Sequence, residues 1–134
     1  MTISVRDDAE RAALDAILAL INGGSGDATG DFEVLTAALA SLAVLAFATT
    51  SFQAASSNAG VAQAVSNAIS NSSTPTPGTI GNGRFRDKAN SAVISFSMSA
   101  SGGGGDMIVS DPVIPSNATA VSCSSITTTL NVTN

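Results

Sequence analysis

The stretch that decides the fold is Val93-Ile94-Ser95-Phe96-Ser97-Met98-Ser99, residues 93–99, in which apolar and polar side chains alternate for most of the length. A period of two places the apolar side chains on one face of an extended strand and the hydroxyl groups on the other. The preceding run alternates in the same way, because Phe85 lies between Arg84 and Arg86. Residues 88–91 fit a turn between the two runs, so this part of the chain predicts two strands joined by a turn.

Short extended segments are also expected on both sides of these strands. Residues 39–48 fit either a strand or a helix, because alanine favours a helix whereas Val44 and Phe47 favour a strand. Prolines and glycines predict loops over residues 72–78 and 101–105. The other segments expected to be extended are residues 32–36, 49–73, 107–109, 120–123 and 126–132. Many short strands separated by turns predict a mainly β fold, an antiparallel β-sandwich or barrel.

One α-helix is expected at the N-terminus, over about residues 8–21. Asp7 and Glu10 have the spacing of a capping box, and Asn22-Gly23-Gly24 supplies a stop. The helix has one apolar stripe, which would dock on its own sheet or on a neighbouring subunit and which consists of Leu14, Ile17, Leu18 and Ile21. A glycine-rich loop over residues 22–31 and a β region over residues 32–134 complete a single predicted domain, residues 1–134.

The composition is poor in large apolar side chains. Of the 134 residues, 56 are Ala, Ser or Thr, and only 35 are Val, Ile, Leu, Phe or Met. Trp and Tyr are absent from the sequence. Since a domain of this size normally buries about two-thirds of its unfolded surface, we expect neighbouring copies or a partner to supply further burial. The composition is that of an assembly subunit.

The charge balance excludes several classes of function. A net charge of −5 argues against partners that are nucleic acids or anionic membranes. The sequence has no His and one Cys, Cys123, which excludes Ser-His-Asp and Cys-His catalytic sites, His-containing zinc sites and an intrachain disulfide. We therefore expect no enzyme, no catalytic residue and no cofactor. Cys123 is expected to be a small buried residue.

For three other stretches of the sequence, a function is considered and is not expected. Residues 34–48 are uncharged and largely apolar, but they are shorter than the roughly 20 residues that a membrane helix needs. No targeting segment is evident, because the first ten residues carry acids where a signal peptide needs basic residues. The loop from Gly23 to Gly30 and the strand after it carry three carboxylates, but their spacing matches no EF-hand, and a solvated loop explains them equally well. No metal site is predicted.

The charged residues that remain are candidates for contacts between subunits. Alternation places three basic side chains on one strand face, where they would pair with acids of a partner subunit or face solvent. Three further charged residues lie on the helix, away from its apolar stripe, and Arg11 and Asp15 are four residues apart. The candidate inter-subunit contacts are Arg84, Arg86, Lys88, Asp8, Arg11 and Asp15.

Several motifs together resemble a known family. They are Met1-Thr2-Ile3-Ser4-Val5-Arg6, residues 13–24, Ala46-Phe47-Ala48-Thr49-Thr50-Ser51-Phe52, Gly60-Val61-Ala62, Gly83-Arg84-Phe85-Arg86-Asp87-Lys88 and Ile114-Pro115-Ser116-Asn117-Ala118-Thr119. This set resembles a family of small structural proteins of tailed bacteriophages. The resemblance implies a virion component without enzymatic activity.

These observations lead to one expected function and two alternatives. We expect a capsid decoration (cement) protein of the virion, made in the bacterial host cytoplasm, that binds the major capsid protein as a homo-oligomer, with a trimer favoured. The first alternative is a structural or adhesive protein of the tail or its fibres. The second is a carbohydrate-binding module, which the absence of Trp and Tyr disfavours.

Overall fold

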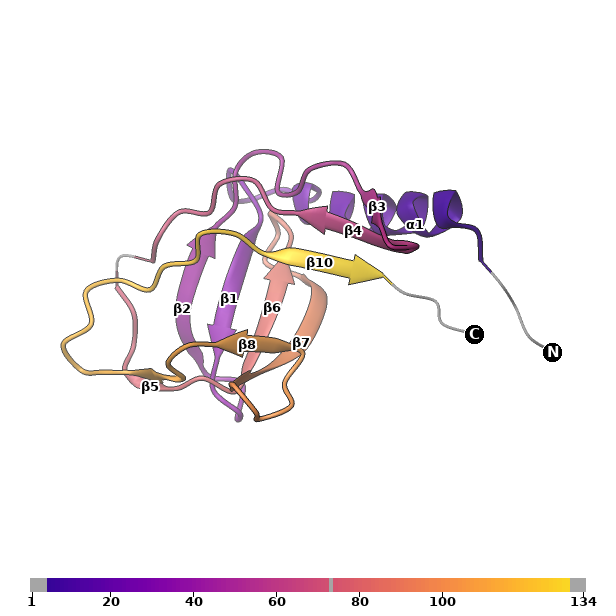
Figure 1. Cartoon of the computed structure of the whole chain (residues 1–134). Coiled ribbons are helices and arrows are strands. Elements are labelled where there is room, and N and C mark those ends of the chain that lie inside the picture. The colour runs from indigo at the N-terminus through magenta and orange to yellow at the C-terminus, as the bar shows by residue number, and fades with distance from the viewer. Residues whose placement is uncertain (1–4, 73, 131–134) are drawn as a thin grey trace.

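The computed structural model describes residues 5–72 and 74–130, which form a mainly β fold with one N-terminal helix (Figure 1). Helix α1 (Asp7–Ala19) runs into the short 3-10 helix η1 (Leu20–Asn22). The strands are β1 (Asp31–Leu35), β2 (Ser41–Ala46), β3 (Ser56–Asn58), β4 (Val61–Val65), β5 (Gly78–Thr79), β6 (Asn82–Arg86), β7 (Ala92–Ala100), β8 (Met107–Val109), β9 (Val113–Ile114) and β10 (Thr127–Leu130). The predicted fold class is therefore confirmed, and residues 39–48 contain a strand.

The largest sheet has the strand order β2-β1-β6-β7-β8 and curls into a half-barrel. The alternating stretch of the sequence forms β6 and β7, an antiparallel pair joined by the predicted turn. One pair differs from the antiparallel expectation, because β8 runs parallel to β7 with Met98 opposite Met107. Between these strands, residues 101–106 must bring the chain back beside Met98 before β8 begins. Gly102 and Gly104 make this return possible, since they adopt positive φ angles of 84° and 74°.

A three-stranded sheet, β10-β4-β3, lies across one end of the half-barrel, with α1 beside it (Figure 1). The helix packs on β4 and buries Leu14 and Leu18, and Ile21 of η1 is fully buried. The apolar stripe thus docks largely within its own chain, although Ile17 stays partly exposed. The predicted capping box is wrong: the N-cap is Arg6 without a side-chain cap, and Asp7 is already helical.

An extended segment over residues 66–72 continues the half-barrel beyond β2. On one side, the Ser70 amide donates to the carbonyl of Ala46 at 2.8 Å. On the other side, the Ser66 amide donates to the carbonyl of Ile126 at 2.8 Å, and the Ser72 amide donates to that of Val121 at 2.9 Å. The C-terminal segment is therefore hydrogen-bonded to the wall through this segment. Residues 131 and 132, the end of the last predicted strand, lie outside the described residues.

The core is organised around an aromatic cluster that contains every Phe of the chain. Its ring centroids are separated by 4.9 to 5.9 Å, and the shortest separation joins Phe85 to Phe96. Phe85 also contacts the rings of Phe32, Phe47 and Phe52. Small residues such as Ala62 and Ala64 complete the core, as the composition predicts.

Candidate functional site

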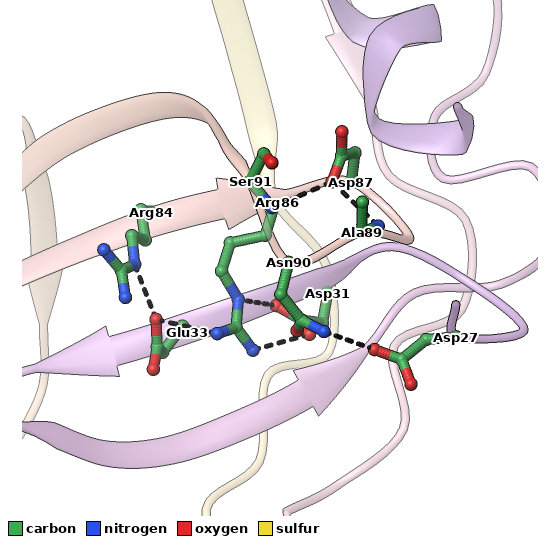
Figure 2. A network of polar contacts seen from close by, with 9 residues as sticks. All are labelled: Asp27, Asp31, Glu33, Arg84, Arg86, Asp87, Ala89, Asn90 and Ser91. Atoms are coloured by element: carbon green, nitrogen blue, oxygen red, sulfur yellow. Dashed lines mark hydrogen bonds and ion pairs between the residues drawn. The ribbon is translucent and has the colours of Figure 1, made fainter. Parts of the chain in front are cut away.

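The outer face of the large sheet carries a network of ion pairs between β1 and β6 (Figure 2). Arg86 and Asp31 form two hydrogen bonds of 2.7 Å, from Nε to Oδ1 and from an Nη atom to Oδ2. Arg84 Nε donates to Oε2 of Glu33 at 2.5 Å, and the same oxygen lies 3.2 Å from Arg86. This arrangement follows from the strand register, in which Glu33 pairs with Arg84 and Asp31 with Arg86.

Burial makes this network a structural feature of the sheet. The Glu33 side chain is only 5% exposed. Burial raises the pKa of Glu33, but hydrogen bonds from Arg84 and Ser41 and the charge of Arg86 outweigh it, so the pKa lies below its ordinary value of 4.5. The hydrogen bond to Asp31 likewise raises the pKa of Arg86, against the effect of its burial. Two arginines and two carboxylates leave this part of the sheet without net charge.

The basic residues that we predicted as inter-subunit contacts therefore have partners within the chain. Arg84 and Arg86 contact Glu33 and Asp31 instead of acids on a neighbouring subunit, and their role at an interface stays a prediction. Lys88 does not share their strand face, because β6 ends at Arg86 and Lys88 lies in the turn that the sequence predicts over residues 88–91.

The Lys88 main chain instead fastens the glycine-rich loop to this turn. Its amide donates to the carbonyl of Gly23 at 3.0 Å, and its carbonyl accepts from the Asp27 amide at 2.8 Å. The side chain of Asn90 also donates to Asp27, at 2.8 Å (Figure 2). These contacts hold the loop beside the ion-pair network.

The three helix residues predicted as contacts lie on or near the surface. Asp8 pairs with Arg6, and Arg11 pairs with Asp7 at 3.3 Å, one turn before it. Asp15 accepts a hydrogen bond of 2.7 Å from the Ala55 amide, which fixes the helix to the segment before β3. The structure does not bring these helix residues together with Arg84 and Arg86 as one site.

The concave face of the half-barrel is open along a cleft between β7 and β8 on one side and β10 with the segment before it on the other. We call it the β7–β10 cleft. It has two adjoining parts of about 670 Å³ and about 430 Å³. Core side chains form its floor, and hydroxyl groups are frequent at its rim. Residues that line it include Phe32, Val34, Ile80, Phe85, Ile94, Phe96, Met98, Met107, Cys123, Ser125, Ile126 and Thr127.

Cys123 lies in the lining of this cleft. Burial raises the pKa of its thiol, and Sγ donates a hydrogen bond of 3.5 Å to the carbonyl of Ser125. A raised pKa keeps the thiol protonated at neutral pH, which disfavours nucleophilic chemistry. Cys123 therefore contributes a small apolar surface to the cleft.

The carboxylates of the glycine-rich loop and of β1 have protein partners. Asp27, Asp31 and Glu33 contact Asn90, Arg86 and Arg84, respectively. Within residues 5–72 and 74–130, no group of three or more His, Cys, Asp or Glu side chains is placed to hold a metal ion. In the same described part of the chain, no helix has the length and apolar character that crossing a membrane requires.

The sequence contained an unused signal for the ion pairs. Two acids, Asp31 and Glu33, flank Phe32, and two arginines flank Phe85. When these strands pair with both phenylalanines on one face, each acid on the other face lies across from an arginine. The cleft had no comparable signal, because it depends on the distance between strands that are far apart in the sequence.

Comparisons with protein-family models, curated proteins and solved structures find no match for this chain. The fold, the ion pairs and the cleft define a mainly β protein with a charge-paired sheet face and an open cleft of mixed apolar and polar lining.

Proposed function

We propose that this chain is a structural subunit of a bacteriophage virion, a capsid decoration protein that binds the head shell as an oligomer. The observation that carries the proposal is the β7–β10 cleft, where apolar side chains packed against the core, among them Ile94, Phe96 and Met107, stay only partly buried. A subunit of this kind gains stability by burying that surface in an assembly. The proposal also uses the resemblance of the sequence motifs to those of small phage structural proteins.

Exposed apolar side chains on separate elements also support an assembly role. They lie on the helix, on the β1–β2 turn, and on three strands, and they are Ile17, Leu20, Leu39, Val44, Ile108 and Val113. Single exposed apolar residues are ordinary on protein surfaces. Together with the partly buried apolar side chains of the β7–β10 cleft, however, they give several surfaces on which neighbouring subunits would bury apolar area.

Leu39 is the most informative of these residues. It lies in the turn between β1 and β2 with a φ angle of 64°, and its side chain is 63% exposed. The left-handed region is unfavourable for leucine by about 1–2 kcal/mol, and glycine or asparagine avoids most of that strain. In the free chain, little burial of the leucine side chain offsets this backbone strain. A leucine at such a position is expected where its side chain inserts into a partner.

The proposal is tested with head shells assembled from the major capsid protein alone. Purified protein is added, shells are pelleted, and bound copies are counted by quantitative mass spectrometry. We expect saturable binding and a higher melting temperature of the shell, since a ligand that binds only the assembled state stabilises it. Sedimentation velocity of the free protein measures its oligomeric state, for which we propose a trimer.

Separated heads and tails from intact particles supply the decisive comparison. Presence of the protein in heads and its absence from tails supports decoration. Presence in tails alone overturns it in favour of the tail or tail-fibre alternative. Absence from both, with no binding to shells, overturns a virion role altogether.

A further inference from the structure

The β7–β10 cleft lies between two strand edges that lack partners in the described part of the chain. One edge of β7 pairs with β6, whereas β8 covers the other edge only at Met98–Ala100. The residues Ala92–Ser97 therefore have a free edge. β10 pairs with β4 along one edge, and within residues 5–72 and 74–130 no strand pairs with its other edge. Both edges contribute residues to the cleft.

The direction of the main-chain groups follows from hydrogen bonds at the ends of these strands. The Met98 amide donates to Gly81, on the β6 side. Since successive residues of a strand point their amides to opposite sides, those of Ser97 and Ser95 point away from β6. The Ser97 amide donates to the carboxylate of Asp106 at 2.9 Å. On that side, no strand of residues 5–72 and 74–130 pairs with Ser95.

The same reasoning applies to β10. The carbonyl of Ile126 accepts from Ser66 on the β4 side, so Thr127 and Thr129 point their main-chain groups toward the opposite edge. The cleft therefore offers hydrogen-bonding main chain on two walls, above a floor of apolar core side chains. Natural proteins normally protect such edges with lysine, proline or a bulge directed at the edge. Neither Ala92–Ser97 nor Thr127–Leu130 contains a lysine or a proline. β7 does carry a bulge at Val93, where its register with β6 shifts, and its pairing with β6 is regular from Ile94 to Ser97.

Charge selects among the possible occupants. The charged side chains in the lining are Asp106 and Asp111, both acidic. A complementary ligand carries a lysine or an arginine at that end and uncharged residues elsewhere. A second copy of this chain fits poorly, because its extended segment with basic residues is β6, where Arg84 and Arg86 already pair with carboxylates.

We propose that the β7–β10 cleft binds one extended strand of a partner protein, by main-chain hydrogen bonding to β7 or β10. Every second side chain of that strand is apolar and enters the cleft, and a basic residue at one end contacts Asp106. This mode of recognition is strand addition to a sheet edge, in which main-chain hydrogen bonds give affinity and alternate side chains give specificity. The inference goes beyond the proposed function and does not depend on where in a virion the chain resides.

The test uses the purified chain and three synthetic peptides. The first is acetyl-Val-Thr-Val-Thr-Val-Lys-amide. The second replaces the central valine by proline, which removes a main-chain donor, and the third ends in glutamate in place of lysine. Titrations to about 1 mM peptide are followed by amide chemical shifts and by hydrogen exchange of the protein.

We expect the lysine peptide to shift and protect the amides of Ser95, Thr127 or Thr129, and the proline peptide to bind at least about tenfold more weakly. The glutamate peptide should also bind more weakly, and the Asp106→Asn variant should reduce that difference. Ser95→Pro removes one edge donor, whereas Ser95→Ala retains it and is the matched control. The peptide comparison uses the unaltered protein, so it stays decisive even where Ser95→Pro does not fold.

Four outcomes overturn the proposal. The first is that none of the peptides binds in this concentration range, and the second is that the shifts lie outside the cleft. The third is equal binding of the lysine and proline peptides, which would show that the cleft takes apolar side chains without strand pairing. Self-association that protects the same amides would assign the cleft to a second copy instead and would likewise contradict the partner strand. Because shell pelleting is a separate measurement, the proposed function and the strand site fail independently.

Discussion

Replacing Asp31 by asparagine tests whether the ion pairs hold the sheet together or remain available to a partner. The Arg86 side chain is 12% exposed and that of Asp31 is 10% exposed, and two hydrogen bonds of 2.7 Å join them. Asparagine keeps one acceptor oxygen and loses the negative charge. Removing one partner of a buried pair costs about 3–5 kcal/mol. Because Arg86 retains its contact with Glu33 at 3.2 Å, we expect Asp31→Asn to lower the free energy of unfolding by about 2–4 kcal/mol.

Asp8→Asn is the matched control, because it makes the same chemical change in an exposed pair. The side chains of Arg6 and Asp8 are 84% and 52% exposed. A surface pair of this kind contributes about 0–1 kcal/mol. Both variants are unfolded in urea and followed by far-ultraviolet circular dichroism, since the chain has no Trp or Tyr for fluorescence. With an m-value of about 2 kcal/mol/M, Asp31→Asn should lower the urea midpoint by about 1–2 M.

A double-mutant cycle with Arg86→Met assigns the loss to the pair. We expect a coupling energy above about 1 kcal/mol between Asp31 and Arg86, as for residues in direct contact. Equal effects of Asp31→Asn and Asp8→Asn, with no coupling to Arg86, would refute the reasoning. Arg86 would then contribute little to the fold and would again be a leading candidate for a contact between subunits.

Three further outcomes follow from the structure. Folding lowers the pKa of Glu33 from its unfolded value of 4.5. The stability that its carboxylate contributes is therefore full above pH 4.5 and is lost as the pH falls through the folded pKa. Urea midpoints measured across this pH range should depend less on acid in Glu33→Gln than in the wild type. Leu39→Asn should leave the thermal midpoint unchanged or raise it, because it relieves about 1 kcal/mol of strain, whereas shell pelleting should show several-fold weaker binding. Gly30→Ala should prevent folding or cost more than about 3 kcal/mol, since a Cβ there would lie 2.3 Å from the carbonyl oxygen of Ile21. Gly60→Ala, which meets no atom within 4 Å and has a positive φ angle, should cost only about 1 kcal/mol in the same urea assay.

Local patterns in the sequence predicted most of the secondary structure. The period-two stretch around Phe96 became β7, and the stripe containing Leu14 and Leu18 became the buried face of α1. These predictions succeed because side-chain alternation and helical spacing are local properties. Residues 39–48 were ambiguous from propensity alone, and pairing with β1 decides the outcome, because Leu45 lies opposite Phe32 in the core.

Long-range pairing explains what the sequence did not predict. No local sequence pattern indicates that β8 runs parallel to β7. The glycines allow the chain to turn back, but they do not specify which strand it then pairs with. The same limit applies to the candidate contacts. Alternation correctly placed Arg84 and Arg86 on one face of a strand, but only the register with β1 shows that Glu33 and Asp31 neutralise them.

The two faces of the large sheet therefore have different capacities for binding. On the outer face, each arginine of β6 already has a carboxylate of β1, so a partner that used these charges would have to break buried ion pairs at substantial cost. On the concave face, apolar side chains meet strand edges that have no partner strand within residues 5–72 and 74–130. A partner strand in the β7–β10 cleft would gain burial and hydrogen bonds without breaking a buried ion pair. This energetic balance is the reason for proposing the cleft, and not the arginines, as the binding surface. Asp31→Asn in the ion-pair network should accordingly reduce stability, and a folded Ser95→Pro variant should reduce the binding of a strand that pairs with β7.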